Sequence, residues 1–355
     1  MIDRYGWREA LAQDFAPYAA RGLLPGRITV QQRGHVIAVT DRGELEARPS
    51  GRLAHEADEG GLPVVGDWVA LAARPEEGAA TIHAVLRRRT AFVRRAAHTV
   101  QDVQVVAANI DVALLTASLN ADFNPRRLER YLAAAWQSGA RPVVALTKAD
   151  LCPDPAAVIA EASALAIGCT VLVVSAVTGQ GLDALAAEVR PGETCVLAGS
   201  SGSGKSTLVN ALAGEARMAT GAIRDDDARG RHTTTHRELV LLPSGALLLD
   251  TPGMRELGLV DADAGLEAAF EDIEALAASC RFGDCTHRAE PGCAVQAALE
   301  ARGLDPDRWR GFQKLQRELT HVERKDDHVA RKAQQKLSIA HNKAQRAQRK
   351  LEKRR

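Results

Sequence analysis

Short apolar runs and turn sequences alternate between residues 27 and 95. β-Branched residues dominate three runs, at positions 28–30, 36–39 and 64–65. Turn sequences rich in Gly, Asp, Glu and Pro separate them, at 33–34, 41–43, 59–61 and 75–78. Strands this short and closely spaced predict a small antiparallel, OB-like β-barrel over residues 27–95. Residues 1–26 precede it with a weak helical spacing of Trp7, Leu11 and Phe15, and we assign this extension no function.

Longer apolar runs with helical periodicity between them begin near residue 105. Apolar residues dominate five segments, at 111–115, 143–146, 171–174, 195–198 and 247–249. Between the first two, Asn124 and Pro125 form a helix start, apolar residues recur at helical spacing from Leu128, and Gly139 ends the pattern. Continuous apolar strands are buried on both faces. The pattern therefore predicts an α/β domain over residues 96–262, with a parallel sheet covered by helices.

A glycine-rich sequence follows the apolar run at 195–198. It matches the phosphate-loop pattern G-x-x-x-x-G-K-[ST] and consists of Gly199, Ser200, Ser201, Gly202, Ser203, Gly204, Lys205, Ser206 and Thr207. Such loops bind nucleotide phosphates through backbone N–H groups and the following helix N-terminus. Lys205 is expected to reach the β- and γ-phosphates, and Ser206 to ligate Mg²⁺. The strand before it and the helical pattern after it are the context that the motif requires.

Two further strand ends carry residues suited to reading a guanine base. Thr147, Lys148 and Asp150 form a T-K-x-D sequence that resembles the guanine-reading motif of GTPases. A carboxylate at Asp150 can accept hydrogen bonds from guanine N1–H and N2–H₂, which adenine lacks. Ser175 and Ala176 resemble the second base-side loop, where the Ala176 N–H would meet guanine O6.

Two sequences after the phosphate loop resemble GTPase switch regions. Asp250 and Gly253 lie in a D-x-x-G sequence, where the aspartate holds Mg²⁺ through water and the glycine N–H senses the γ-phosphate. Thr234, in the 230–235 run, is our choice for the threonine that ligates Mg²⁺, with its neighbours in that run as the alternatives. The residue after the D-x-x-G loop is Met254, which cannot orient water. His232 is our catalytic candidate, with a group supplied by a partner, or a purely structural histidine, as alternatives.

The order of these motifs is unusual, because the base-reading sequences precede the phosphate loop. This is the order of a circularly permuted GTPase. With the small barrel, the run at 230–235 and a Cys/His cluster near residue 285, the chain resembles the circularly permuted, small-ribosomal-subunit-dependent GTPases (the RsgA/YjeQ family) over roughly residues 27–325. The resemblance implies binding to the immature small subunit and its rRNA, GTP favouring the bound state and hydrolysis favouring release. Thr147 stands where Asn is commoner, which would weaken base affinity.

A cysteine-rich segment predicts a metal centre in the next domain, residues 263–325. The pattern C-x₄-C-x-H-x₅-C provides Cys280, Cys285, His287 and Cys293. Three sulfurs and one imidazole suit one structural, tetrahedral Zn²⁺. The alternative is three buried thiols with a surface histidine. The other cysteines, at 152, 169 and 195, are expected to pack in the core.

Composition and charge exclude some classes of protein. The 355 residues are 46% hydrophobic and 26% charged, which is typical of a globular protein. No apolar run is long enough for a membrane helix, and no basic-then-apolar leader is present, so we expect a cytoplasmic protein without a membrane partner. Separately, we expect it to be monomeric. Residues 329–355 carry ten Lys or Arg and one Glu, within a basic tail that we assign to 326–355. This tail predicts a polyanionic partner or a solvated segment.

A second basic sequence flanks the end of the predicted barrel. Arginines at 87–89 and 94–95 surround Phe92, and they indicate either a solvated edge or an RNA-facing patch. The leading hypothesis is therefore a GTPase in late maturation of the small ribosomal subunit, stimulated by that subunit. The rivals are an RNA-binding module gated by nucleotide with negligible catalysis, and an ATP-dependent kinase or RNA-remodelling enzyme.

Overall fold

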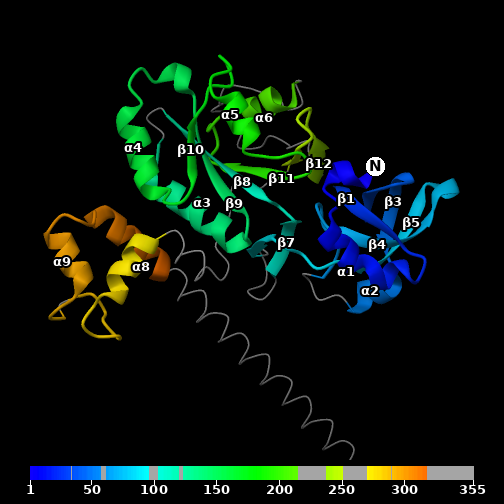
Figure 1. Ribbon diagram of the computed structural model, residues 1–355, viewed down its shortest axis with the longest axis horizontal. Helices are drawn as coiled ribbons and strands as arrows, with labels where there is room; N and C mark the ends of the chain where they lie inside the picture. Colours follow the sequence, from blue (N-terminus) through cyan, green and yellow to red (C-terminus); the bar gives the residue numbers. More distant parts are fainter. Residues whose placement is uncertain are drawn as a thin grey trace, which may run out of the picture.

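The computed structural model describes eight stretches of the chain: residues 1–32, 34–56, 61–95, 103–119, 123–214, 237–250, 270–288 and 290–317. They form a barrel, a helix-covered sheet and a small helical unit, arranged in that order along the long axis of the molecule (Figure 1). The predicted architecture, with a barrel before and a helical domain after an α/β domain, is confirmed.

The barrel contains five strands. They are β1 (Leu24–Gln32), β2 (His35–Thr40), β3 (Gly43–Pro49), β4 (Trp68–Arg74) and β5 (Ala79–Val85). Their order is β1-β2-β3-β5-β4, and pairing of β4 with β1 closes the barrel. A short helix α2 (Gly51–Glu56) and a 3₁₀ turn (Pro75–Glu77) fill the connections. The strand predicted at 64–65 is wrong, since the buried Asp67 carboxylate accepts the Val64 N–H and holds a turn there.

The N-terminal extension packs against this barrel. A 3₁₀ turn (Ile2–Tyr5) leads to α1 (Glu9–Ala19), as the spacing of Leu11 and Phe15 predicts. Both side chains are buried in a cluster with Trp68 of β4. The Trp7 ring lies edge-on to Trp68, with centroids 5.0 Å apart. Burial of these rings makes the extension part of the barrel's core.

A two-stranded hairpin follows the barrel, formed by β6 (Ala91–Arg95) and β7 (Val103–Ala108). Phe92 is only 3% exposed, so its ring is not available to stack on a base. Arg88 forms a bidentate ion pair with the buried Asp67, and Arg89 pairs with Asp111. Arg88 therefore holds a turn within the barrel, whereas Arg89 links the barrel to the next domain.

Within the part of the chain that the structure describes, the second domain contributes six strands to a continuous sheet. Its strands are β8 (Val112–Ser118), β9 (Arg141–Thr147), β10 (Thr170–Val173), β11 (Thr194–Gly199), β12 (Arg237–Leu241) and β13 (Leu247–Asp250). The order is β10-β9-β8-β11-β13-β12, and every neighbouring pair is parallel except β12 with β13. The predicted parallel sheet is confirmed, with β11 at its centre.

Helices cover both faces of this sheet. α3 (Pro125–Ser138) and α4 (Ala156–Leu165) share one buried cluster, whereas α5 (Leu182–Ala187) and α6 (Lys205–Ala213) share the other. Successive strand residues divide between the clusters, as for Leu114 and Leu115 of β8. Asn124 caps α3 by accepting the Arg127 N–H, and Gly139 ends it in the left-handed conformation, as predicted.

The buried Arg27 connects the N-terminal extension, the barrel and the α/β domain. β1 pairs with both β2 and β12, which makes barrel and sheet continuous. Arg27 of β1 donates to the carbonyls of Tyr5 and Asn109 and to the Thr194 hydroxyl, and its guanidinium lies over the Trp68 ring. Desolvation lowers the pKa of Arg27 to about 10, so it stays charged at neutral pH.

The C-terminal unit contains α8 (Glu271–Ala278), α9 (Ala294–Glu300) and a helix over residues 306–317. Phe270, Trp309 and Phe312 form its aromatic core, with ring centroids 5.4 and 5.6 Å apart.

Two cysteines of the α/β domain lie outside the C-terminal unit. Burial raises the pKa of Cys169 to about 11 and that of Cys195 to about 12, which keeps both as thiols, in agreement with a packing role. Among the described residues, none of the helices has the length and apolar character needed to cross a bilayer.

Candidate functional site

The glycine-rich loop lies between β11 and α6, at the carboxyl edge of the sheet. Gly199 ends β11 beside Thr116 of β8. A Cβ atom at Gly199 would lie 2.1 Å from Thr116 Oγ1 and 2.5 Å from the Thr116 carbonyl oxygen, so only glycine fits. Gly204 has a φ of 85° and caps α6, whose first residues are Lys205, Ser206 and Thr207. The backbone thus turns from strand to helix within five residues, as phosphate-binding loops do.

Lys205 reaches back over this loop. Its Nζ lies 2.8 Å from the Gly199 carbonyl oxygen and 2.5 Å from that of Ser200. The loop also bonds to itself, since the Ser203 N–H donates to the Ser200 carbonyl. The Lys205 ammonium and the N-terminus of α6 therefore lie at the same loop, and both attract an anion.

Two threonines from other strands hold Ser203 of this loop, and we call Thr116, Ser203 and Thr147 the threonine clamp. Thr116 Oγ1 lies 3.1 Å from the Ala198 carbonyl oxygen and 2.8 Å from Ser203 Oγ. Because a hydroxyl has one proton, Thr116 donates to Ala198 and accepts from Ser203. On the other side, Thr147 Oγ1 donates to the Ser203 carbonyl at 2.7 Å. All three side chains are buried, with 1–4% exposure.

The first of the two predicted base-reading sequences contacts the phosphate loop through this clamp. Thr147 ends β9, and Lys148 follows with a φ of 61°. The Ser175 hydroxyl, which is fully buried after β10, donates to Asp150 Oδ1 at 2.6 Å. The structure therefore joins the ends of β9 and β10 through Asp150 and Ser175, and it joins the end of β9 to the phosphate loop through Thr147 and Ser203. Ala176 follows Ser175 and is half-buried.

The predicted switch residues lie mostly outside the described residues. His232, Thr234 and Gly253 belong to that group. Asp250 is the last residue of β13, which pairs with β11. Its backbone therefore lies at the same sheet edge as the phosphate loop.

The four predicted metal ligands form one cluster. The Sγ atoms of Cys280, Cys285 and Cys293 and a ring nitrogen of His287 all lie within 4.8 Å of one another. The two distances from His287 Nδ1 to the Sγ atoms of Cys280 and Cys293 are 3.5 Å, and those sulfurs are 3.9 Å apart. A tetrahedral Zn²⁺ places two sulfurs about 3.8 Å apart and a sulfur and a nitrogen about 3.6 Å apart. The donor set and its spacing therefore fit a metal ion.

Hydrogen bonds shift the pKa values of groups in this segment. Desolvation raises the pKa of the Cys280 thiol, but hydrogen bonds with the N–H groups of Val295 and Ala294 and with the thiols of Cys293 and Cys285 together lower that pKa overall. Glu290 accepts hydrogen bonds from the Thr286 hydroxyl and from the N–H groups of Thr286 and Arg288, which holds its pKa well below its usual range. This carboxylate fixes the loop between the second and fourth ligands.

Comparison with known proteins agrees with this geometry. The family model described as "RsgA GTPase" matches residues 85–260. The "Small ribosomal subunit biogenesis GTPase RsgA" of Opitutus terrae is 47% identical over 343 residues, covering 94% of both chains. The chain belongs to the RsgA GTPase family. The protein of the same name from Streptomyces coelicolor is 48% identical, covering 93% of this chain and 90% of that one.

Two solved structures share the fold of this chain. YjeQ from Thermotoga maritima superposes with a TM-score of 0.64 at 23% identity, covering 84% of this chain and 99% of that one. YloQ, described as a circularly permuted GTPase, superposes with a TM-score of 0.62 at 24% identity, covering 84% and 96%. An "ABC transporter" family model also matches residues 182–353. Both family models include the phosphate loop, a sequence that many nucleotide-binding domains share.

Sequence reasoning missed Thr116 in this RsgA-family chain. The signal was a hydroxyl residue inside the largely apolar strand β8, directly beside Gly199 in the parallel register. A polar residue in a strand buried on both faces needs a hydrogen-bond partner, and here the partner is the phosphate loop.

Proposed function

We propose that this protein is a cytoplasmic GTPase that acts in maturation of the small ribosomal subunit. The observation that carries the proposal is the contact of Thr147 with Ser203, which joins a guanine-type loop to a phosphate loop. The names of the relatives at 47% and 48% identity support the ribosomal part.

Guanine recognition would rest on Asp150. Its Oδ1 accepts the Ser175 hydroxyl, which orients the carboxylate and leaves its other oxygen for the base N–H donors. Lys148 would lie along the base, and the Ala176 N–H would meet O6. Adenine would leave the carboxylate without its donors, which costs binding energy.

Phosphate binding would use the N–H groups of residues 199–207 and the Lys205 ammonium. Mg²⁺ would be held by the Ser206 hydroxyl with Thr234 and Asp250, and it would neutralise charge on the phosphates. Gly253 would report the γ-phosphate. His232, or a group from the subunit, would orient the attacking water. The Asp250 loop precedes the C-terminal domain in the chain, so loss of the γ-phosphate could be transmitted there and favour release.

The Cys/His cluster would hold one structural Zn²⁺. Four protein ligands complete a tetrahedral site and leave no position for substrate, so the ion would stabilise the C-terminal unit without taking part in hydrolysis. Trp309 packs edge-on against the His287 ring at 5.7 Å, which links the metal site to the 306–317 helix.

The test measures hydrolysis of GTP and ATP by the full chain, with and without purified small ribosomal subunits. We expect slow GTP hydrolysis alone, a marked increase with subunits, and negligible ATP hydrolysis. Hydrolysis of ATP at a similar rate would refute guanine specificity. A GTP rate that subunits leave unchanged would refute the ribosomal function, and His232→Ala should lower only the stimulated rate.

A further inference from the structure

A single aromatic side chain is exposed in this protein, and it lies in the loop between Cys280 and Cys285. Every Phe, Trp and Tyr of the chain is among the described residues, and Phe282 is the one that is exposed, at 42%. The others are buried or half-buried, as Phe92 of the hairpin is. Apolar area favours burial, so a ring left in water is a candidate contact for a partner.

The loop holds Phe282 and its neighbour Arg281 in place before any partner binds. The Arg281 N–H donates to the Gly292 carbonyl at 3.2 Å, and the Cys285 N–H donates to the Phe282 carbonyl at 3.2 Å. The Arg281 stem lies against Gly292, where a Cβ atom would come within 3.1 Å of Arg281 Cβ and 3.3 Å of its Cδ. Cys280 and Cys285, on either side, belong to the ligand cluster. Little conformational freedom is therefore lost when the ring binds a partner.

The surface around the ring is suited to a nucleobase. Arg281 Cζ lies 5.4 Å from the centroid of the Phe282 ring, so a guanidinium accompanies the ring at the surface. A Cβ atom at Gly283 would meet none of the described atoms within 4 Å, which leaves open space beside the ring. Unpaired RNA bases stack on aromatic rings and on arginine planes. A ring with a guanidinium next to it offers both.

The same surface is poorly suited to the apolar centre of a protein interface, because such a centre is contiguous and a single ring is not. Outside the C-terminal unit lie the other exposed large apolar side chains of the described residues: Met1, Leu62, Leu151, Ile167 and Val177. Around Phe282 the loop instead exposes Arg281, Asp284 and Arg288. Glu290, its second acid, accepts hydrogen bonds within the loop. Two arginines against one remaining acid favour an anionic partner.

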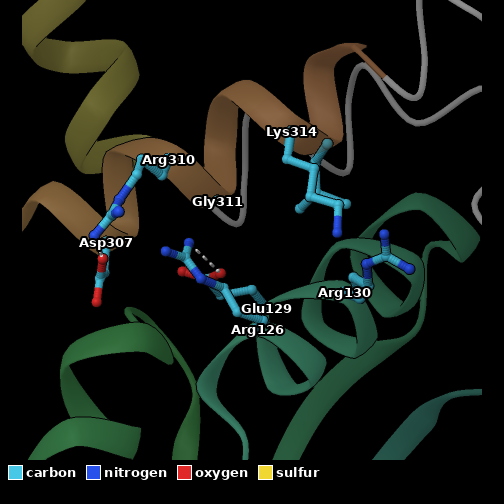
Figure 2. Close-up of a pocket in the computed structure, with 8 residues that line it drawn as sticks. Arg126, Glu129, Arg130, Asp307, Arg310, Gly311 and Lys314 are labelled. Atoms are coloured by element: carbon cyan, nitrogen blue, oxygen red, sulfur yellow. Dashed lines mark hydrogen bonds and ion pairs between the residues drawn. The ribbon is translucent and has the colours of Figure 1, made fainter.

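The C-terminal unit that carries this loop is held against α3 of the α/β domain. Glu129 of α3 lies 3.4 Å from Arg308 Nη1, and both side chains are buried. Figure 2 shows Glu129 and Arg126 of α3 facing Gly311 of the 306–317 helix, where a Cβ atom would lie 1.8 Å from Arg126 Nη1. This close packing limits the directions in which the unit can present Phe282. A partner bound at the ring would therefore position the nucleotide-binding domain as well.

We propose that the Phe282 ring stacks on an unpaired base of the small-subunit RNA, with the Arg281 guanidinium beside it. The proposal rests on the proposed ribosomal function, to which it adds a residue that contacts the RNA. The ring supplies stacking, which any base can accept, and the guanidinium supplies hydrogen-bond donors for the RNA backbone. Neither side chain belongs to the nucleotide site or to the ligand cluster, so hydrolysis by the free protein does not depend on them.

The test measures binding to purified small subunits at several salt concentrations, with full chains loaded with a non-hydrolysable GTP analogue. It compares wild type with Phe282→Ala, Phe282→Leu and Phe282→Trp. We expect the Ala and Leu variants to bind about tenfold more weakly, the effect of losing one stacked base, and Phe282→Trp to bind as wild type does. The salt dependence of binding should have the same slope in all four proteins, because a ring makes no phosphate contact.

Ile167→Ala is the matched control, because Ile167 is exposed to nearly the same extent, 41%, but lies in the α/β domain. This variant should bind subunits as wild type does. Metal content and unfolding temperature are measured for every variant, and basal GTP hydrolysis should be unchanged in all of them. If Phe282→Ala loses metal, the comparison of Phe282→Leu with Phe282→Trp decides.

Three outcomes would overturn the proposal. Equal affinities of Phe282→Leu and Phe282→Trp would show that the ring does not stack. A loss of affinity that comes with a smaller salt slope would mean that phosphate contacts elsewhere were lost, which makes Phe282 a structural residue of the loop. A photo-crosslinking benzoylphenylalanine at position 282 should join to RNA, and a link only to ribosomal protein would assign the ring to a protein partner. Wild type that binds no subunits would instead refute the proposed function, on which this proposal rests.

Discussion

Replacement of Thr116 by valine tests whether the threonine clamp prepares the phosphate loop for nucleotide. Valine keeps the shape of the side chain and removes its hydroxyl. The change leaves the Ala198 carbonyl and the Ser203 hydroxyl, both buried, without the partners that Thr116 provides at 3.1 and 2.8 Å. Two lost hydrogen bonds at about 1 kcal/mol each give about 2 kcal/mol. If the loop relaxes to recover them, nucleotide affinity falls by up to about 30-fold, since about 1.4 kcal/mol is tenfold.

The assay is a fluorescence titration of the purified chain with a labelled guanosine diphosphate, with the unfolding temperature measured in parallel. Thr116→Ser is the matched control, because it keeps the hydroxyl and should stay within about threefold of wild type. A double-mutant cycle with Ser203→Ala isolates the contact between the two hydroxyls. We expect the two changes to be less than additive.

Two results would refute this reasoning. Thr116→Val could bind nucleotide as tightly as wild type while it unfolds at a lower temperature, which would make the hydroxyl a purely structural group. Thr116→Ser could weaken binding as much as valine does, which would assign the effect to packing of the methyl group.

Three further predictions concern other parts of the chain. Asp150→Asn should shift nucleotide preference from GTP towards xanthosine triphosphate, because an amide can donate where the carboxylate accepts, and unchanged preference in a competition assay would contradict the base-reading role. Cys293→Ala should lose the bound zinc measured by metal analysis and unfold at a lower temperature, whereas Cys169→Ala, outside the cluster, should keep the metal; equal zinc in both would contradict the assignment. Arg88→Ala should lower the free energy of unfolding by about 3 kcal/mol at pH 8, because it leaves the Asp67 carboxylate buried and unpaired. Desolvation already raises the pKa of Asp67, and loss of Arg88 raises that pKa further. The loss of unfolding free energy is therefore complete above the raised pKa and should shrink as acid protonates the Asp67 carboxylate. Urea titrations at pH 8 and pH 5 that show the same loss of unfolding free energy would contradict this.

Local sequence was enough to predict the elements whose geometry depends on neighbours in the chain. The start and end of α3 follow from Asn124, Pro125 and Gly139, because a cap acts within a few residues. The four-ligand cluster follows from the spacing of Cys280 to Cys293, since one short segment supplies every donor. Strand boundaries were less well predicted. Val64 and Val65 are β-branched but lie in a turn, because the hydrogen bond that the buried Asp67 carboxylate accepts from the Val64 N–H outweighs their intrinsic preference.

The sequence by itself determined the order of the motifs along the chain. It also determined the residues of the phosphate loop, because a short glycine-rich pattern specifies the local backbone conformation. Only the tertiary structure decided which distant residues touch. Thr116 precedes Ser203 by 87 positions and Glu129 precedes Arg308 by 179, yet each pair is in contact in the folded protein. No local preference encodes such contacts. The first contact exists because β8 and β11 pair in a parallel register. The second exists because the helices on either side of Gly311 pack closely. Both arrangements depend on how the whole chain folds.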